Sequence, residues 1–185
     1  MLPVPARTIM DVVVGHGGSS RVMDRSRVDL VSDSLQETQE FGASLGQLLR
    51  GGEVICLEGE LGSGKTTFIQ GIGRGLGVDG PITSPTFTLV NEYRGENLTF
   101  YHVDLYRVES RREIIASGLD DLFFGEGVCA IEWAEKAKGL VPPERLWIIL
   151  KHGGERRRLI SMEAVGPGYE DLLSSLEGEL AGRRR

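Results

Sequence analysis

Residues 59–66 constrain this chain more than any other part of its 185-residue sequence. They read GELGSGKT and match the phosphate-binding pattern G-x-x-x-x-G-K-S/T at every fixed position. Glycines let successive backbone N–H groups curl around phosphate oxygens, where a Cβ would block the approach. The apolar run EVICLE (53–58) leads into the loop and an apolar-faced helix leaves it. The sequence therefore predicts the strand–loop–helix unit of a P-loop nucleotide-binding protein.

Strand-like and helix-like segments alternate along residues 27–185. Capping boxes at 34–37 and 110–113 mark two helix starts, each with Ser followed three residues later by Glu. The pattern predicts the α/β class, as a P-loop NTPase-like three-layer sandwich whose largely parallel central sheet carries antiparallel hairpins at its edges. The hairpins are expected from the strand-like pairs 87–93 with 98–104 and 145–152 with 156–165.

Residues 1–26 lack the periodicity of the rest and are interrupted by glycines and serines, so we expect a flexible N-terminal extension. Residues 27–185 are expected to form one P-loop domain. No apolar run approaches the roughly 18 residues of a membrane span, and no secretory pattern is visible, so we expect a cytoplasmic protein without membrane association. The net charge of -6 argues against tight direct binding of nucleic acid.

A second glycine cluster lies at positions 71, 73, 75 and 77. It suggests the dinucleotide-binding pattern G-x-G-x-x-G, but the third glycine of that pattern falls on Leu76 and no strand precedes it. We predict close helix packing and a helix stop here instead.

The chemistry of a triphosphate site assigns roles to several residues around the loop. Lys65 is placed to reach the β- and γ-phosphates, and the hydroxyl of Thr66 is placed to ligate Mg²⁺. A carboxylate at the end of a neighbouring buried strand normally completes the metal site, and both Asp104 and Glu132 end such strands. Spacing alone leaves open which acid binds the metal and which orients water.

Residues 83–86, Thr-Ser-Pro-Thr, lie between the P-loop helix and the first predicted hairpin. Their hydroxyls are suited to sensing a γ-phosphate, and an ordinary proline turn explains the segment equally well.

The motifs GELGSGKTT, SPTFTLVNEY, YHVDLYR and IEW occur in that order within about residues 27–165. Together they resemble the TsaE family, the bacterial P-loop ATPases needed to make threonylcarbamoyladenosine in tRNA. The resemblance implies a cytoplasmic ATPase that uses ATP and Mg²⁺. It also implies action in a complex with the TsaB and TsaD proteins, with tRNA reached only through that complex.

The resemblance also assigns site residues. It implies a catalytic set of Lys65, Asp104 and Glu132, and a metal site made by Thr66 and Glu132. It places Thr86 in a switch-like loop and Thr38 near the adenine. The implied nucleotide-binding residues are Thr38, Glu60, Leu61, Gly62, Ser63, Gly64, Lys65, Thr66, Thr67, Thr86 and Trp133.

Two other functions are compatible with the same loop. One is a small-molecule kinase, in which the arginines at 107, 111 and 112 form a lid. The other is a nucleotide-gated assembly module with little hydrolysis. No arginine of the sequence is an obvious arginine finger, so for an ATPase we expect weak activity of the chain alone and activation by a partner surface.

Overall fold

The computed structural model describes residues 27–183, and the predicted extension 1–26 lies outside the described residues. Among the described helices, none is both long and apolar enough to cross a membrane. The elements in chain order are β1 (Arg27–Ser32), α1 (Leu35–Leu48), β2 (Val54–Glu58), α2 (Lys65–Gly75), β3 (Val90–Arg94), β4 (Thr99–Asp104), α3 (Arg111–Ala116), α4 (Leu119–Leu122), β5 (Val128–Glu132), the 3₁₀ helix η1 (Ala134–Ala137), β6 (Arg145–His152), β7 (Arg158–Val165) and α5 (Pro167–Gly182).

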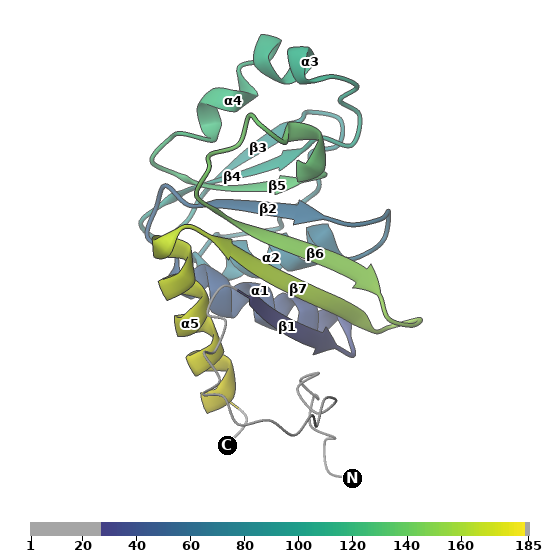
Figure 1. Ribbon diagram of the computed structural model, residues 1–185, viewed down its shortest axis with the longest axis vertical. Coiled ribbons are helices and arrows are strands. Elements are labelled where there is room, and N and C mark those ends of the chain that lie inside the picture. Colours follow the sequence, from purple (N-terminus) through teal and green to yellow (C-terminus); the bar gives the residue numbers. More distant parts are fainter. Residues whose placement is uncertain (1–26, 184–185) are drawn as a thin grey trace, which may run out of the picture.

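All strands join one seven-stranded sheet in the order β1-β7-β6-β2-β5-β4-β3 (Figure 1). The central strands β6, β2, β5 and β4 run parallel to one another. At one edge β3 pairs antiparallel with β4, and at the other β7 and β1 add antiparallel strands. The predicted parallel centre with hairpin edges is confirmed. The parallel arrangement matters for the site because the carboxyl ends of these central strands meet at one edge.

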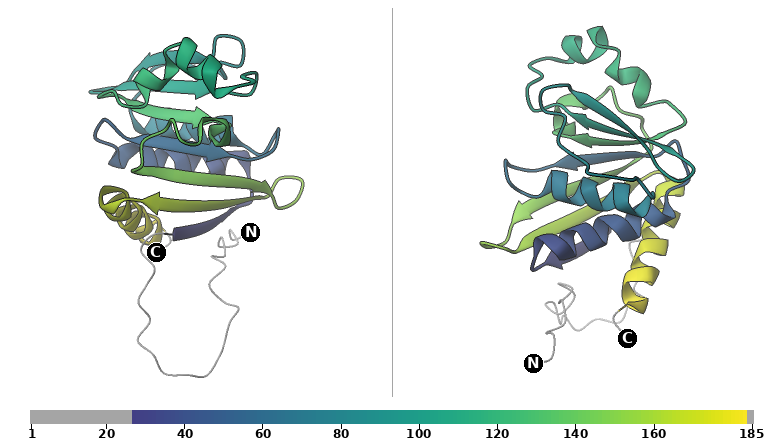
Figure 2. Two further views of the ribbon diagram at one scale, coloured as in Figure 1. Left: turned by 45° about the horizontal axis from the view of Figure 1, so that its top comes forward. Right: turned by 180° about the vertical axis from the view of Figure 1, so that it is seen from behind.

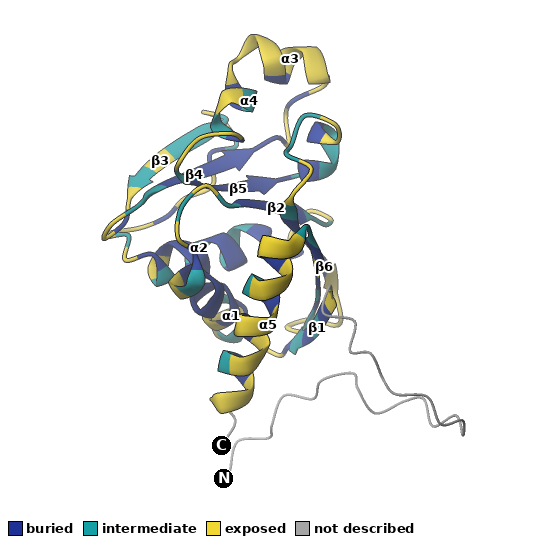
Figure 3. Cartoon of the chain, turned by 60° about the vertical axis from the view of Figure 1, so that its left-hand side comes forward, coloured by how far each residue is buried: buried dark blue, intermediate teal, exposed yellow. Residues whose placement is uncertain are grey.

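Helices cover both faces of the sheet (Figure 2). Helices α1, α2 and α5 bury the larger apolar core against one face, and α3, α4 and η1 bury a smaller core against the other. Along β2, Ile55 and Leu57 belong to the first core, whereas Val54 and Cys56 belong to the second. Figure 3 shows the consequence, with dark buried strands between helices whose outer faces are exposed. The predicted three-layer sandwich is therefore confirmed.

The strand predicted from residue 87 begins only at Val90. The backbone N–H groups of Thr88 and Leu89 both donate to the carbonyl oxygen of Pro85, at 3.0 and 2.7 Å, which closes a turn. Leu89 adopts a left-handed conformation with φ of 66°, so the extended backbone cannot start before it. This turn leaves the side chain of Phe87 81% exposed.

Helices α1 and α2 touch through their backbones. A Cβ on Gly42 would lie 2.2 Å from the carbonyl oxygen of Phe68, and one on Gly71 would lie 2.2 Å from that of Gln39. Contacts this short leave no room for any side chain, so the predicted close helix packing is confirmed. Gly77, with φ of 73°, follows the end of α2 as the predicted helix stop. The glycines of this seam are Gly42 and Gly46 of α1 with Gly71 and Gly75 of α2.

The seam makes a prediction for Gly71→Ala. Alanine favours an isolated helix by about 1 kcal/mol over glycine, yet we expect the variant to be destabilised by about 1–3 kcal/mol because its methyl group meets backbone atoms of α1. Calorimetry or thermal unfolding measures the change. Gly178→Ala on α5 is the matched control, since open space surrounds that position and a small gain is expected there. A Gly71→Ala protein as stable as the Gly178→Ala protein would contradict the close contact.

Candidate functional site

The loop between β2 and α2 has the backbone that a phosphate cradle needs. Gly59, Gly62 and Gly64 have φ angles of 152°, 75° and 104°, which side-chain-bearing residues rarely adopt. A Cβ on Gly59 would lie 2.3 Å from the carbonyl oxygen of Leu150 on β6, so the loop also packs tightly against the sheet. Helix α2 begins directly at Lys65, and the positive end of its dipole lies at the loop. This is a binding place for anions.

A cavity of about 260 Å³ opens beside the loop, at the carboxyl edge of the parallel strands. It gathers the P-loop, residues 83–86 (here the switch loop) and the ends of β4 and β5 around one space. Most of the predicted site residues therefore lie together. The lining residues are Leu35, Leu61, Gly62, Gly64, Lys65, Thr66, Thr67, Ser84, Thr86, Asp104, Tyr106, Glu132 and Trp133.

The remaining predicted residues lie elsewhere. Glu60 lines a neighbouring cavity of about 510 Å³, which shares Trp133 with the first. Ser63 is buried inside the loop. Thr38 is also buried, and its hydroxyl lies 2.7 Å from the Ser32 hydroxyl and 3.1 Å from the Ser34 carbonyl oxygen that it donates to. Thr38 thus stabilises the start of α1 and does not line the cavity.

The side chain of Lys65 is folded back onto the P-loop. Its Nζ donates hydrogen bonds to the carbonyl oxygens of Gly59 at 2.7 Å and Glu60 at 3.0 Å. The same ammonium lies 3.9 Å from the ring centroid of Trp133, within cation–π range. Trp133 directly follows β5, and its backbone is left-handed with φ of 59°. The indole ring of Trp133 therefore packs against the ammonium group of Lys65.

Two opposing effects act on the pKa of the Lys65 ammonium. Burial lowers the pKa of Lys65, while the carboxylates of Glu132, Glu135 and Asp104 counteract this by favouring the charged form. Burial also raises the pKa of Glu135, which lines the neighbouring cavity together with Trp133. The lysine is thus a cation held between carboxylates in a poorly solvated place.

The residues predicted to hold a metal are in direct contact. The hydroxyl of Thr66 donates to Oε1 of Glu132 at 2.7 Å, and Glu132 stands beside Asp104 in the β4–β5 register. Among residues 27–183, no three His, Cys, Asp or Glu side chains gather closely enough to hold a metal by themselves. A hydroxyl and a carboxylate fit Mg²⁺, which usually takes one or two protein oxygens and completes its shell with phosphate oxygens and water.

Asp104 is bonded to the switch loop. Its Oδ2 accepts from the hydroxyls of Ser84 at 2.8 Å and Thr86 at 2.6 Å, while Oδ1 accepts from the backbone N–H of Tyr106 at 2.9 Å. Oδ2 therefore accepts two hydrogen bonds and Oδ1 accepts one. Thr86 lines the cavity as predicted, and the bond from Ser84 joins the rest of the loop to the same acid.

Sequence reasoning did not single out His102. This residue of β4 is fully buried, and its Nε2 lies 2.9 Å from Oε1 of Glu132. The sequence could have indicated this residue, because His102 lies two positions before Asp104 and alternate residues of a strand point to the same face of the sheet.

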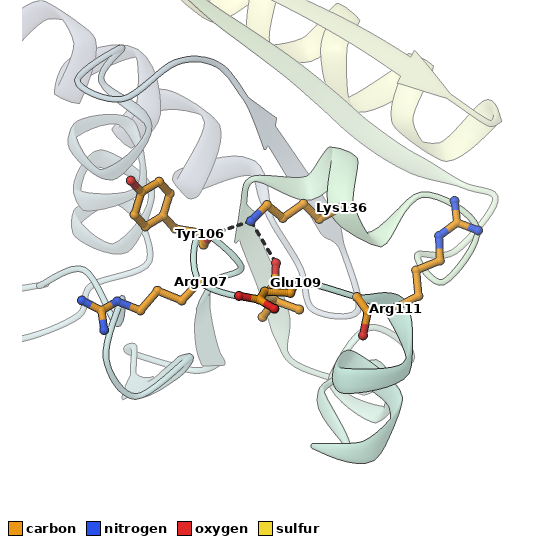
Figure 4. Close-up of a pocket in the computed structure, with 7 residues that line it drawn as sticks. Tyr106, Arg107, Glu109, Arg111 and Lys136 are labelled. Atoms are coloured by element: carbon orange, nitrogen blue, oxygen red, sulfur yellow. Dashed lines mark hydrogen bonds between the residues drawn. The ribbon is translucent and has the colours of Figure 1, made fainter.

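A wider groove of about 840 Å³ lies beside the cavity, between residues 106–111 and η1 (Figure 4). Lys136 of η1 crosses it and donates to the carbonyl oxygens of Tyr106 and Val108. Arg107 lies 4.1 Å from the ring centroid of Phe87, and Arg111 extends in the opposite direction. These two arginines do not converge on the cavity as a kinase lid would.

Comparison with known proteins identifies the family of this chain. The family model for the threonylcarbamoyl adenosine biosynthesis protein TsaE matches residues 32–160. The tRNA threonylcarbamoyladenosine biosynthesis protein TsaE of Bacillus subtilis (strain 168) is 43% identical over 141 residues, covering 76% of this chain and 88% of the relative. The protein of the same name from Treponema pallidum (strain Nichols) is 41% identical over 132 residues, covering 71% and 97%.

The fold has a close counterpart among solved structures. The crystal structure of Bacillus subtilis YdiB superposes with a TM-score of 0.70 at 37% identity, covering 83% of this chain and 95% of that one. The family model spans the P-loop, the switch loop and the ends of β4 and β5. This chain belongs to the TsaE family of threonylcarbamoyladenosine biosynthesis proteins.

Proposed function

We propose that this chain binds ATP with Mg²⁺ in the P-loop cavity and hydrolyses it while threonylcarbamoyladenosine is made in tRNA. We further propose that it does so together with TsaB and TsaD proteins, and reaches tRNA only through them. The observation that carries the proposal is the 2.7 Å hydrogen bond between Thr66 and Glu132. It joins the first turn of the P-loop helix to a strand-end carboxylate, which is the arrangement that a nucleotide-bound Mg²⁺ requires.

Lys65 and the loop amides supply the phosphate contacts of this proposal. The ammonium now donates to two neutral carbonyl oxygens of the loop. Exchanging them for phosphate oxygens would pair the ammonium with an ionised acceptor in place of a neutral one, which adds the attraction between opposite charges. The ring of Trp133 keeps water from one side of the ammonium, and this strengthens its interaction with the phosphate charge.

Thr66 and Glu132 would hold the metal, and Asp104 would orient the attacking water. A bound Mg²⁺ ion would supply positive charge that stabilises the β- and γ-phosphate oxygens. Oδ2 of Asp104 already accepts from Ser84 and Thr86, whereas among the described residues Oδ1 accepts only from the backbone N–H of Tyr106 and can take a further hydrogen bond from water. Movement of the switch loop would shift this carboxylate and with it the water that it orients.

Among residues 27–183, no second cation lines the cavity to stabilise the transferred phosphoryl group. Lys65 is the one basic residue among those that line it. P-loop enzymes that hydrolyse rapidly use an additional arginine, often from a partner protein. A docked partner that inserts such a group and moves the switch loop would complete the site.

A nucleotide-gated assembly module is the second candidate. The bonds from Ser84 and Thr86 to Asp104 favour it, because they tie the switch loop directly to a strand-end acid of the cavity. In that function the switch loop would report bound ATP to the partners with little turnover.

Lys65→Ala is expected to weaken ATP binding by about 10- to 100-fold, the value of a charged hydrogen-bond donor lost from a poorly solvated site. Isothermal titration calorimetry with ATP and Mg²⁺ measures the change, and circular dichroism verifies the fold. Lys138→Ala is the matched control, since that lysine is exposed and does not line the P-loop cavity. Equal affinities of the two variants would remove Lys65 from the phosphate site.

Glu132→Gln is expected to abolish most of the gain in ATP affinity that Mg²⁺ provides. Its affinity in EDTA should stay equal or improve, because a negative charge near the phosphates is removed. Calorimetry with and without metal gives both values, and Glu177→Ala on the exposed face of α5 serves as the control. Equal losses with and without metal would exclude Glu132 from the coordination shell.

Phosphate release by the purified chain alone is expected to be slower than about 1 per second, the lower end of typical kinase rates. Adding TsaB and TsaD should raise it by about tenfold or more if they complete the charge stabilisation, and no metabolite should become phosphorylated. Fast turnover by the chain alone would contradict the incomplete site. Equal assembly with ATP and a non-hydrolysable analogue, without turnover, would favour the assembly module.

A further inference from the structure

His102 lies inside the protein, directly behind the predicted metal ligand. Its side chain on β4 is 0% exposed, and it points to the same face of the sheet as Asp104 two residues later. Nε2 lies 2.9 Å from Oε1 of Glu132 on the neighbouring strand β5. No step of the proposed hydrolysis uses this imidazole, although it contacts the site.

The hydrogen bonds around Glu132 define the direction of this contact. An ionised carboxylate only accepts hydrogen bonds, so Nε2 of His102 donates to Oε1, as does the hydroxyl of Thr66. Nδ1 of the same ring is buried without a partner among the described residues. A ring protonated only at Nδ1 would have no proton to donate to Glu132, whereas a ring protonated at Nε2 makes this bond and leaves a lone pair at Nδ1. The geometry therefore assigns the Nε2–H tautomer.

The two carboxylate oxygens of Glu132 consequently differ. Oε1 receives both donors, whereas Oε2 receives no hydrogen bond from the described residues, and Glu132 lines the cavity. One oxygen is anchored and the other is available to a ligand in the cavity. A carboxylate held in this way keeps its orientation before the ligand arrives.

We propose that His102 is a positioning residue, which orients the Glu132 carboxylate so that its free oxygen meets the Mg²⁺ of the bound nucleotide. The inference rests on the proposed function. The imidazole acts on the metal only through Glu132, as outer partners of metal ligands commonly do. Its contribution should appear in metal-dependent binding and be absent from metal-free binding.

Three variants test the role. His102→Leu removes the donor, His102→Gln retains an N–H at a similar reach, and Phe100→Leu changes another fully buried residue of β4 that has no contact with Glu132. Calorimetry measures ATP affinity with Mg²⁺ and with EDTA for each protein, and thermal unfolding records the stability of each. Mn²⁺ paramagnetic resonance with ADP provides a second measure of metal affinity.

We expect His102→Leu to reduce the Mg²⁺-dependent gain in affinity by about 10-fold, while affinity in EDTA stays unchanged. His102→Gln should recover most of the Mg²⁺-dependent gain in ATP affinity. Phe100→Leu should lower the melting temperature and leave that gain unchanged. A His102→Leu protein that loses stability as Phe100→Leu does and keeps the full metal-dependent gain would overturn the proposal.

The unliganded protein gives an independent readout. Nitrogen NMR of the histidine rings should show His102 protonated at Nε2 and bare at Nδ1, and Glu132→Gln should shift the Nε2 resonance. A ring protonated at Nδ1 alone would overturn the assigned contact. Wild-type protein without any Mg²⁺-dependent ATP affinity would instead refute the proposed function, even where the NMR result confirms the tautomer.

Discussion

The parallel pairing of β4 with β5 is the constraint on which the site depends. It places Asp104 beside Glu132 at the same edge of the sheet where β2 turns into the P-loop. The carboxylates come from distant parts of the chain, and only this register brings both within reach of the first turn of α2. The hydrogen bond from Thr66 to Glu132 then connects the helix to the sheet across the cavity.

The side chains that line the cavity carry more negative than positive charge. Lys65 is the one cation lining the cavity, whereas Asp104 and Glu132 contribute two carboxylates. Under the proposed function, a triphosphate without a metal would meet this negative charge close to its own, and a divalent cation bound with it would offset the repulsion. The same carboxylates counteract the lowering of the Lys65 pKa that its burial causes.

Sequence patterns predicted the features that depend on local chemistry. The P-loop, the strand-end acids and the close packing of the helix that carries Gly71 and Gly75 each follow from short runs of particular residue types, whereas the partner of that helix, α1, came from the structure. The bonds of Asp104 to the switch loop and the contact of His102 with Glu132 depend on strand register and on a turn, so no local pattern gave them. The start of the strand predicted at 87–93 was wrong for the same reason, because the left-handed backbone of Leu89 follows from the turn closed by Pro85.

The glycine seam between α1 and α2 has a mechanical consequence for the cavity. Leu35 at the start of α1 and Thr66 at the start of α2 both line it, and the seam joins the two helices backbone to backbone. With no side chains in between to change rotamer, this half of the cavity wall behaves as one stiff block. Any widening or narrowing must come from the opposite half, where hydroxyl groups alone hold the switch loop to Asp104. The wall formed by α1 and α2 is therefore the rigid side of the cavity, and the switch loop is its adjustable side.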